Sequence, residues 1–496
     1  MPHVELIPTG ASGSASLPSG GTAGQVLTRK GTTETEWTSA ATAINVQTYC
    51  PKNTATEDCT KGFKEAFEAG SAVFAPTGEY LFGKGETIVM ASKTLFGAGP
   101  GRTILKVKNT SSNLFACTGG PVQISELTIE QTSDITALSG IMVFAHELAE
   151  KRPNKASTFV MHHVDFIRPW IGTEVKRDEP TSYVTQAVIE NCNFFLVRKT
   201  CIIGEGPNLL TIAKCFGEMA VAKVPAIKLK GCAAIAMSKV NFEKGEPVCI
   251  LESCELSHFE DCFFDEGEGA TIELGGGCVI TGSTGLQFVN CWFNGSAGMR
   301  VASSVRVSFV NCEFSTCAAG AYVKATAAWV SFDDCDFTNN VTAGCLIEKG
   351  ATDFSITNCR TAVGARNLQE YGIKVEKGHS VRYVITGNMG HETTYAQQNL
   401  IAGVLDEGEP IMESEAFEEL KLGSKLVVTE GSAGFFKFRE LLKGATVSGT
   451  GVQVGSVVEK IINDHELELD KTAESNQTKK ILTFKSSAFK NVSGNF

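Results

Sequence analysis

Two acidic residues stand at the same place in neighbouring copies of a repeated phrase. Glu313 and Asp336 each follow the cysteine of an Asn/Asp-Cys pair. Two carboxyl groups on one wall are the arrangement that cleaves glycosidic bonds by acid–base chemistry, so these two residues are the candidate catalytic residues. The sequence holds no Gly-x-Ser-x-Gly and no phosphate-binding glycine loop. It therefore favours a non-enzymatic protein, and if the chain is an enzyme, we expect a glycan hydrolase or lyase.

Two aromatic residues occupy the same position in earlier copies of the phrase. Phe263 and Trp292 also follow the corner cysteine, and aromatic rings on a protein surface can stack on sugar rings. We therefore name them as candidate glycan-binding residues. The competing interpretation is that this outward column forms a subunit interface or simply faces solvent.

Metal and cofactor chemistry is not indicated. Cys249 and Cys254 have no second pair at zinc-ligand spacing, so no metal site is predicted. His162 and His163 stand beside an expected coil corner, and we interpret them as surface histidines. No cofactor is predicted either, since no nucleotide-binding fingerprint is present.

The repeated phrase must position all these residues. Its periodicity is the main signal in the chain. The aligned positions from Cys192 to Asn388 are separated by 21 to 29 residues. The clear copies are Val188–Phe194, His258–Phe264, Leu286–Phe293, Val307–Phe314, Val330–Phe337 and Phe354–Cys359, and the weaker ones are Leu127–Ile129, Val164–Phe166, Met237–Phe242 and Ile385–Asn388.

The phrase reads as a strand, a bend and a second strand. Val307 and Phe309 alternate with polar residues, and Cys312 and Phe314 alternate in the opposite phase. The phase reverses at Asn311, and asparagine and aspartate tolerate the positive φ that turns a strand through a corner. Stacked coils should therefore form an outer ladder and an inner cysteine stack. The predicted ladder residues are Asn191, Asn290, Asn311 and Asn358 outside, with Cys192, Cys262, Cys291, Cys312, Cys335 and Cys359 inside.

We predict an all-β fold, a right-handed single-stranded parallel β-helix. Leucine-rich repeats have similar lengths, but they keep leucine at several fixed positions and usually add a helix. The coils should span residues 44–407, with a capping helix near 58–69 covering the open end of the solenoid. Alternating segments after residue 407 predict a small antiparallel β domain over 408–496. Residues 1–43 should form an extended N-terminal anchor.

Composition limits the partners. The net charge of −11 gives no counterion-release advantage on a polyanion, so no nucleic acid is expected. No run of 18 apolar residues exists, and the start of the chain lacks a signal peptide, so we expect no membrane span and synthesis in the host cytoplasm. The 17 cysteines should behave as small buried apolar groups, with disulfides left open for a few of them.

Two segments resemble known families. The ordered set Ile44–Val46, the helix, Ala72–Tyr80 and Leu95–Thr103 resembles the opening of pectate-lyase-like β-helices of phage tailspike and tail-fibre proteins. With the coils, this resemblance covers roughly 44–400. The Asp-Gly-rich stretch usual before the helix is replaced here by Cys50–Asp58, which barely affects the fold. Pro18–Gly31 with Trp37 resembles a repeat common in phage tail and head fibres.

These resemblances imply a virion protein. We expect a spike or fibre, assembled as a homotrimer, that contacts a host-surface polysaccharide. Residues 1–43 would attach it to another virion protein. The alternatives are a tailspike that depolymerises polysaccharide, and a head fibre or capsid decoration protein. A secreted cellular pectinase is disfavoured by the missing signal peptide and by the fibre-like N-terminus.

Overall fold

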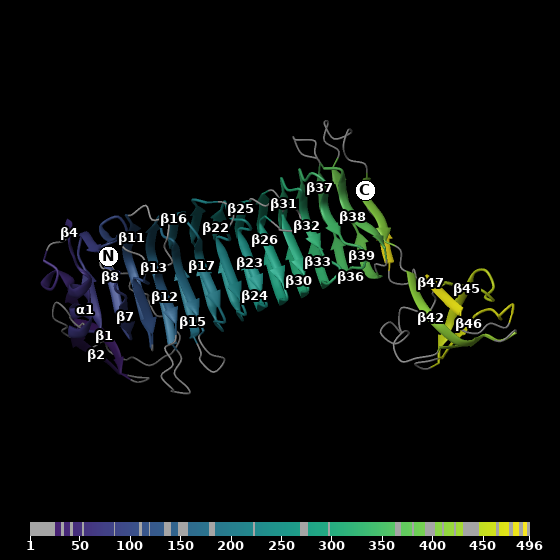
Figure 1. Ribbon diagram of the computed structural model, residues 1–496, viewed down its shortest axis with the longest axis horizontal. Helices are drawn as coiled ribbons and strands as arrows, with labels where there is room; N and C mark the ends of the chain where they lie inside the picture. The colour runs from purple at the N-terminus through teal and green to yellow at the C-terminus, as the bar shows by residue number, and fades with distance from the viewer. Residues whose placement is uncertain are drawn as a thin grey trace.

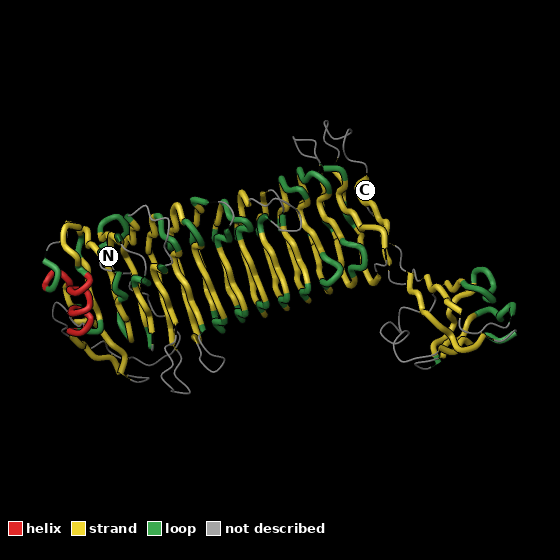
Figure 2. The backbone as a smooth tube through the Cα atoms, viewed as in Figure 1, coloured by secondary structure: helices red, strands yellow, loops and turns green. Residues whose placement is uncertain are grey.

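The molecule is a long solenoid followed by a small barrel (Figure 1). The computed structural model describes residues 25–30, 34–39 and 43–493 except 52–53, 84, 109–111, 119, 133–139, 147–156, 178–183, 222–223, 268–275, 296–297, 363–368, 379–380, 392–401, 409–410, 421–422, 430–445, 463–465, 476–479 and 486–489. Almost all regular structure is strand, with a single α-helix among the described residues (Figure 2). The predicted all-β solenoid is confirmed.

Each central coil contributes one strand to each of three parallel sheets, whereas β11 (Val122–Gln131) and β13 (Ser157–Ile167) each run through two of the sheets. In one central coil these are β27 (Thr284–Val289) in sheet I, β28 (Trp292–Gly295) in sheet II and β29 (Met299–Ala302) in sheet III. The next strand, β30 (Val305–Val310), pairs in parallel with β27 and starts the following coil. Sheet III has 13 strands, from β7 (Ile88–Ala91) to β41 (Ala402–Gly408).

The corner between sheets I and II is the most regular part of the coil. Only two residues, such as Asn311 and Cys312, separate β30 from β31 (Glu313–Ser315). The first of the two has a positive φ in every central coil, which turns the strand and explains the phase reversal. These φ values are 52° at Asn191, 53° at Asp261 and Asn290, 51° at Asn311, 52° at Asp334 and 55° at Asn358.

Side-chain hydrogen bonds join this corner from coil to coil. The amide of Asn311 donates to the Oδ1 atom of Asn290 at 2.7 Å, and Asn290 donates to Asp261 at 3.3 Å. Asn358 turns away from this line and donates to Asp333 at 3.1 Å. The corner is therefore a ladder of polar contacts on the solvent side of the solenoid.

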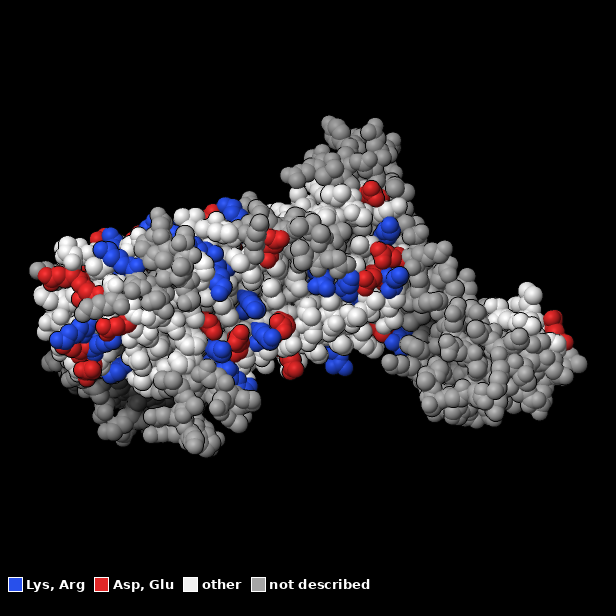
Figure 3. All heavy atoms as spheres, viewed as in Figure 1, with Lys and Arg blue, Asp and Glu red and all other residues white. Residues whose placement is uncertain are grey.

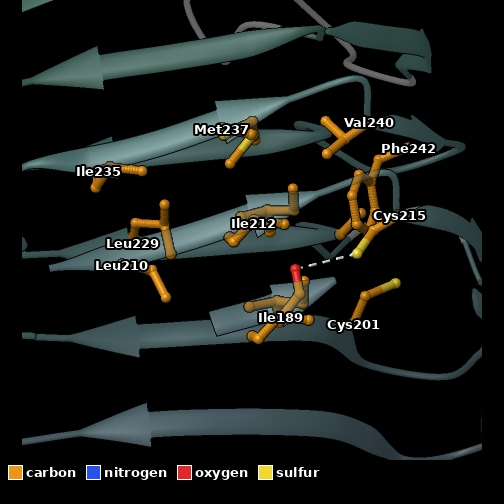
Figure 4. Packing of buried hydrophobic residues seen from close by; sticks show 14 of the residues in the cluster. Ile189, Cys201, Leu210, Ile212, Cys215, Leu229, Ile235, Met237, Val240 and Phe242 are labelled. Carbon is orange, nitrogen blue, oxygen red and sulfur yellow. Dashed lines mark hydrogen bonds between the residues drawn. The ribbon is translucent and has the colours of Figure 1, made fainter. Parts of the chain in front are cut away.

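The interior is built from stacked residues of one kind. The corner cysteines Cys192, Cys262, Cys291, Cys312, Cys335 and Cys359 are all buried. Cys215 shares this column, and its thiol donates to the backbone oxygen of Ile189 in the preceding coil at 3.6 Å (Figure 4). Phe293 and Phe314 stack with ring centroids 5.0 Å apart. Burial of such columns is the main stabilising contribution, at about 25 cal/mol per Å² of apolar surface.

The N-terminal end of the solenoid is closed by helix α1 (Thr60–Ala69). Phe63, Ala66 and Phe67 are buried at helical spacing, and Phe63 packs edge-on against Tyr80 with ring centroids 5.6 Å apart. Cys50 and Cys59 form a disulfide on either side of strand β4 (Thr54–Asp58), which precedes the helix. The sequence left disulfides open for a few cysteines, and these two, with Cα atoms 5.6 Å apart, are joined. The other fifteen are free and buried.

Both ends of the chain carry small antiparallel elements. Strands β1 (Gln25–Lys30) and β2 (Glu34–Ser39) pair as a hairpin, whereas most of the anchor expected over 1–43 lies outside the described residues. The predicted C-terminal antiparallel domain is a closed six-stranded barrel, from β42 (Ile411–Leu420) to β47 (Lys480–Lys485).

The C-terminal domain ends earlier than the expected boundary at residue 496. Strand β48 (Lys490–Ser493) leaves the barrel and pairs in parallel with β39 (Val381–Thr386) of sheet I. The physical reason is that β39 is the last coil strand of its sheet and would otherwise present an unpaired edge. The final strand of the chain therefore belongs to the solenoid.

Candidate functional site

The outward column named in the sequence lies on sheet II. Phe263 of β25 (Phe263–Gly267) pairs in register with Trp292, Trp292 with Glu313, and Glu313 with Asp336 of β34 (Asp336–Thr338). All four side chains face away from the core, since Phe264, Phe293, Phe314 and Phe337 occupy the alternate inward positions. We call these four residues the acidic–aromatic strip.

Contacts within the strip set what it can do. Glu313 is exposed and is the register partner of Asp336 in the following coil. Their two strands lie about 4.8 Å apart. Asp336 is engaged by Arg360 of the next coil, with Nη2 and Oδ2 at 2.6 Å. The strip therefore offers one open carboxylate beside a carboxylate–guanidinium pair. A catalytic role for Glu313 and Asp336 stays a prediction.

Phe263 and Trp292, the aromatic half of the strip, do not present one flat surface on which a sugar ring could stack. Phe263 is 42% exposed, and its ring meets Trp292 in a T-shaped contact with centroids 5.6 Å apart. The indole N–H of Trp292 donates to the Ser315 hydroxyl at 2.8 Å. Only part of the Trp292 face is left to a ligand, so glycan binding by Phe263 and Trp292 also stays a prediction.

A groove that the sequence did not indicate lies on the outer face of sheet I. It has a volume of about 590 Å³ and crosses β30, β33 (Ala328–Asp333), β36 (Thr352–Thr357) and β39. Its floor carries the hydroxyls of Ser308, Ser331 and Ser355, which are register partners in successive coils. We call it the tryptophan groove, because Trp329 at its wall is 62% exposed.

One backbone feature builds the wall of the tryptophan groove. Arg306, Trp329, Asp353 and Arg382 occupy equivalent positions in successive coils and all have positive φ, between 54° and 59°. The pairings of β30 with β33, of β33 with β36 and of β36 with β39 skip this position on both strands and stay in register on either side, so each of these residues forms a bend in its strand. The four residues line the groove together with the three serines.

An ion pair lies at the C-terminal end of this wall. Arg382 pairs with Asp353 at 2.5 Å, and the Thr352 hydroxyl donates to the same carboxylate at 2.9 Å. The Asp353 side chain is only 6% exposed, whereas Arg382 is 35% exposed and keeps part of its surface toward solvent. The groove thus combines an exposed indole, a row of hydroxyls and a partly exposed guanidinium.

The wall residues stand at a constant distance from the corner in the sequence. Each wall residue stands six residues before the corner cysteine or its equivalent, as Trp329 stands before Cys335. Residue type gives no signal, because the position holds Leu256, Gly285, Arg306, Trp329, Asp353 and Arg382 in turn. Only the skipped register of the paired strands reveals that these residues share one wall.

Charge on the visible face of the molecule is mixed, with acidic and basic residues interspersed over the solenoid (Figure 3). Among the described residues, no helix has the length and apolar character needed to cross a bilayer. One group of three potential metal ligands, Glu126, His162 and His163, lies at the sheet I–II corner near the N-terminal end of the solenoid.

Comparison with known proteins bears on the fold. Solved structures similar to the chain include the A-module of mannuronan C-5 epimerase AlgE6 of Azotobacter vinelandii, at 12% identity over 73% of this chain and 98% of that one, with a TM-score of 0.44. Tailspike protein 3 of bacteriophage CBA120 is 15% identical over 78% of this chain and 64% of its own, with a TM-score of 0.49. Gene product 12 of bacteriophage phi29 is 13% identical over 70% and 52%, with a TM-score of 0.47.

Comparison at the level of sequence gives fewer matches than comparison of structures. No curated protein matches the chain. Residues 184–361, which contain the clear copies of the phrase, match the family described as the right handed beta helix region. The stacked coils and this match together identify the solenoid as a right-handed parallel β-helix.

Proposed function

We propose that this protein is a phage virion spike or fibre that binds a host-surface glycan in the tryptophan groove. The observation that carries the proposal is the exposed indole of Trp329 beside the row of Ser308, Ser331 and Ser355 hydroxyls. Ligand sites of this kind are concave, with an apolar surface and a few placed polar groups. The volume of about 590 Å³ fits a short oligosaccharide segment.

Sugar chemistry suits each part of the groove. The C–H face of a pyranose ring is apolar and packs on an aromatic surface, as Trp329 provides. The ring hydroxyls would exchange hydrogen bonds with the serine floor and with the guanidinium of Arg382. Because serines recur in register from coil to coil, a polysaccharide could lie along the solenoid axis with equivalent contacts in successive coils.

The assembly part of the proposal rests on sequence. The fibre-like segment Pro18–Gly31 precedes an elongated, capped solenoid, which suits a rigid body held at its N-terminus. Homotrimer formation and attachment to another virion protein through residues 1–43 are inferred from the family resemblance. The native mass of the full chain, beside a chain lacking residues 1–43, tests this part: we expect three copies for the full chain, and a monomer in both cases would contradict it.

Binding to purified host-envelope polysaccharide tests the groove. Trp329→Ala should weaken binding at least tenfold, about 1.4 kcal/mol, because the stacking surface is lost. Leu256→Ala is the matched control, since Leu256 occupies the equivalent position in an earlier coil and is 75% exposed. Phe263→Ala reports on the rival strip. A loss with Phe263→Ala and none with Trp329→Ala would move the site to sheet II.

The depolymerase alternative is favoured by one observation, the register pairing of Glu313 with Asp336. Release of reducing ends or unsaturated sugars from the bound polysaccharide would support it. The double variant Glu313→Gln with Asp336→Asn should then abolish release and leave binding in the groove unchanged. Antibody labelling of virions separates tail spikes from head fibres, because a signal on the capsid would overturn the tail position.

A further inference from the structure

Two histidines and a glutamate meet at the corner column near the N-terminal end of the solenoid. Glu126 lies in β11 (Val122–Gln131), and His162 and His163 lie in β13 (Ser157–Ile167) of the next coil. Glu126 and His163 are corner residues with φ of 58° and 51°, the position that asparagine occupies in later coils. The same backbone geometry that stacks asparagines therefore stacks a carboxylate on an imidazole here.

The ligand atoms of these three residues converge. The Nδ1 atoms of His162 and His163 are 3.2 Å apart, and the His163 Nδ1 atom is 3.0 Å from Oε1 of Glu126. All three lie within 4.8 Å of one another. A tetrahedral zinc ion with ligands at 2.0–2.1 Å separates them by about 3.3 Å. Small side-chain rotations would place all three around one ion.

The proton balance of the cluster also favours a cation. The role of each Nδ1 atom depends on the tautomer, and when both imidazoles carry their proton on Nε2, the two Nδ1 lone pairs and the carboxylate meet with no proton between them. A divalent ion would bind both imidazole lone pairs and the carboxylate at once. Two histidines with one carboxylate, leaving positions open, is an established donor set for transition metals.

A second carboxylate near the cluster is engaged elsewhere. Glu190 is in register with His162 in the following coil, but it is paired with Lys214 at 2.9 Å. Glu126, whose Oε1 atom contacts His163, is therefore the carboxylate that completes the ligand set.

A further contact fits the role of an outer ligand partner. The side-chain amide of Gln123 lies 2.8 Å from the His162 Nε2 atom, on the side of the ring away from the cluster. Metal-binding histidines almost always donate their second ring N–H to such a group. Half a turn of the Gln123 amide places its oxygen there as the acceptor.

We propose that Glu126, His162 and His163 bind one divalent transition-metal ion of the zinc type, with solvent completing the coordination. The ion would join two successive coils at the N-terminal end of the corner ladder. This site is independent of the tryptophan groove and of the proposed virion function.

Zinc titration of the metal-free full chain, without a histidine tag, tests the site. We expect one Zn²⁺ per chain by calorimetry and a higher melting temperature with Zn²⁺ than without. His163→Asn should weaken binding more than tenfold and abolish the temperature shift, while the corner keeps a residue that tolerates positive φ. Glu126→Gln should weaken binding in the same direction.

The matched control is His258→Asn, since His258 is exposed on sheet I in a distant coil. It should bind zinc as the unsubstituted chain does, and it retains the same fifteen buried thiols, so uptake by cysteine is equal in all variants. Unchanged binding in His163→Asn, or no zinc uptake by the full chain at micromolar concentration, would overturn the proposal.

Discussion

The side-chain amide of Asn311 donates a hydrogen bond of 2.7 Å to Asn290 in the preceding coil, and both residues have a φ near 50°. Each asparagine therefore does two things at once: it adopts the conformation that turns the strand, and it links adjacent coils. The cysteine that follows is buried because the turn reverses the face of the strand.

This relationship predicts how substitutions at the corner rank. Asn311→Gly removes the side-chain hydrogen bond but keeps the backbone free to adopt positive φ. Asn311→Val removes the bond and also places a β-branched residue in the left-handed region, at a further cost of roughly 1–2 kcal/mol. Thermal unfolding should therefore rank the chains as unsubstituted, glycine and valine in decreasing stability. Equal stability of the two variants would mean that backbone strain does not govern the corner.

Because the free cysteines are buried, we expect their thiols not to react with a thiol reagent in the folded protein. Burial raises the pKa of the Cys317 thiol to about 12 and raises the pKa values of Cys201 and Cys345 as well. All fifteen free thiols are buried and out of reach of a reagent in solution, so the folded protein should react very slowly with Ellman's reagent even at pH 9.

The unfolded chain is the control for this titration. Guanidinium without reductant should expose fifteen reactive thiols, and prior reduction should raise the number to 17 if Cys50 and Cys59 are joined. A thiol that reacts within seconds in the folded state would contradict the packing of the cysteine column.

The regular corner is the part of the fold that sequence could predict. The Asn/Asp–Cys pair marks a place where backbone conformation and burial both demand particular residues, so its recurrence fixes the register of the coils. The bend at Trp329 has the same positive φ, but its side chain is exposed and residues as different as Leu256 and Arg306 stand there in other coils, so residue type does not mark it. The groove therefore emerges only when the strands are paired.

The histidine cluster shows a second limit of the sequence. Glu126 and His163 directly precede Leu127 and Val164, which stand where later copies of the phrase have the corner cysteine. Their coils lack both the asparagine and the cysteine, so the sequence placed the two histidines beside a corner but did not bring Glu126 to them. The contact depends on a register that only the paired strands β11 and β13 define.

The return of β48 to the solenoid predicts a protective role for the end of the chain. A chain ending at Lys485 lacks β48 and leaves the backbone of β39 unpaired at the edge of sheet I. Open parallel edges recruit other strands, so this chain should form larger assemblies or aggregates by light scattering. A chain shortened only by residues 494–496 keeps β48 and should behave as the full chain does. Identical behaviour of both truncations would show that this strand pairing does not protect the edge.

The ion pair in the tryptophan groove predicts a difference between two arginines that share one wall. Arg382→Ala leaves the Asp353 carboxylate, 6% exposed, without its cationic partner and with the Thr352 hydroxyl as its remaining bond. An uncompensated buried carboxylate should cost about 2 kcal/mol of folding stability. Arg306 occupies the equivalent position three coils earlier and is exposed, so Arg306→Ala should change stability by less than about 0.5 kcal/mol. Asp353→Asn combined with Arg382→Ala should recover part of the loss, because the unpaired charge is gone. Thermal unfolding of the three variants measures these effects. Equal losses for the two arginines would mean that water in the groove solvates the Asp353 carboxylate, so that it does not depend on Arg382.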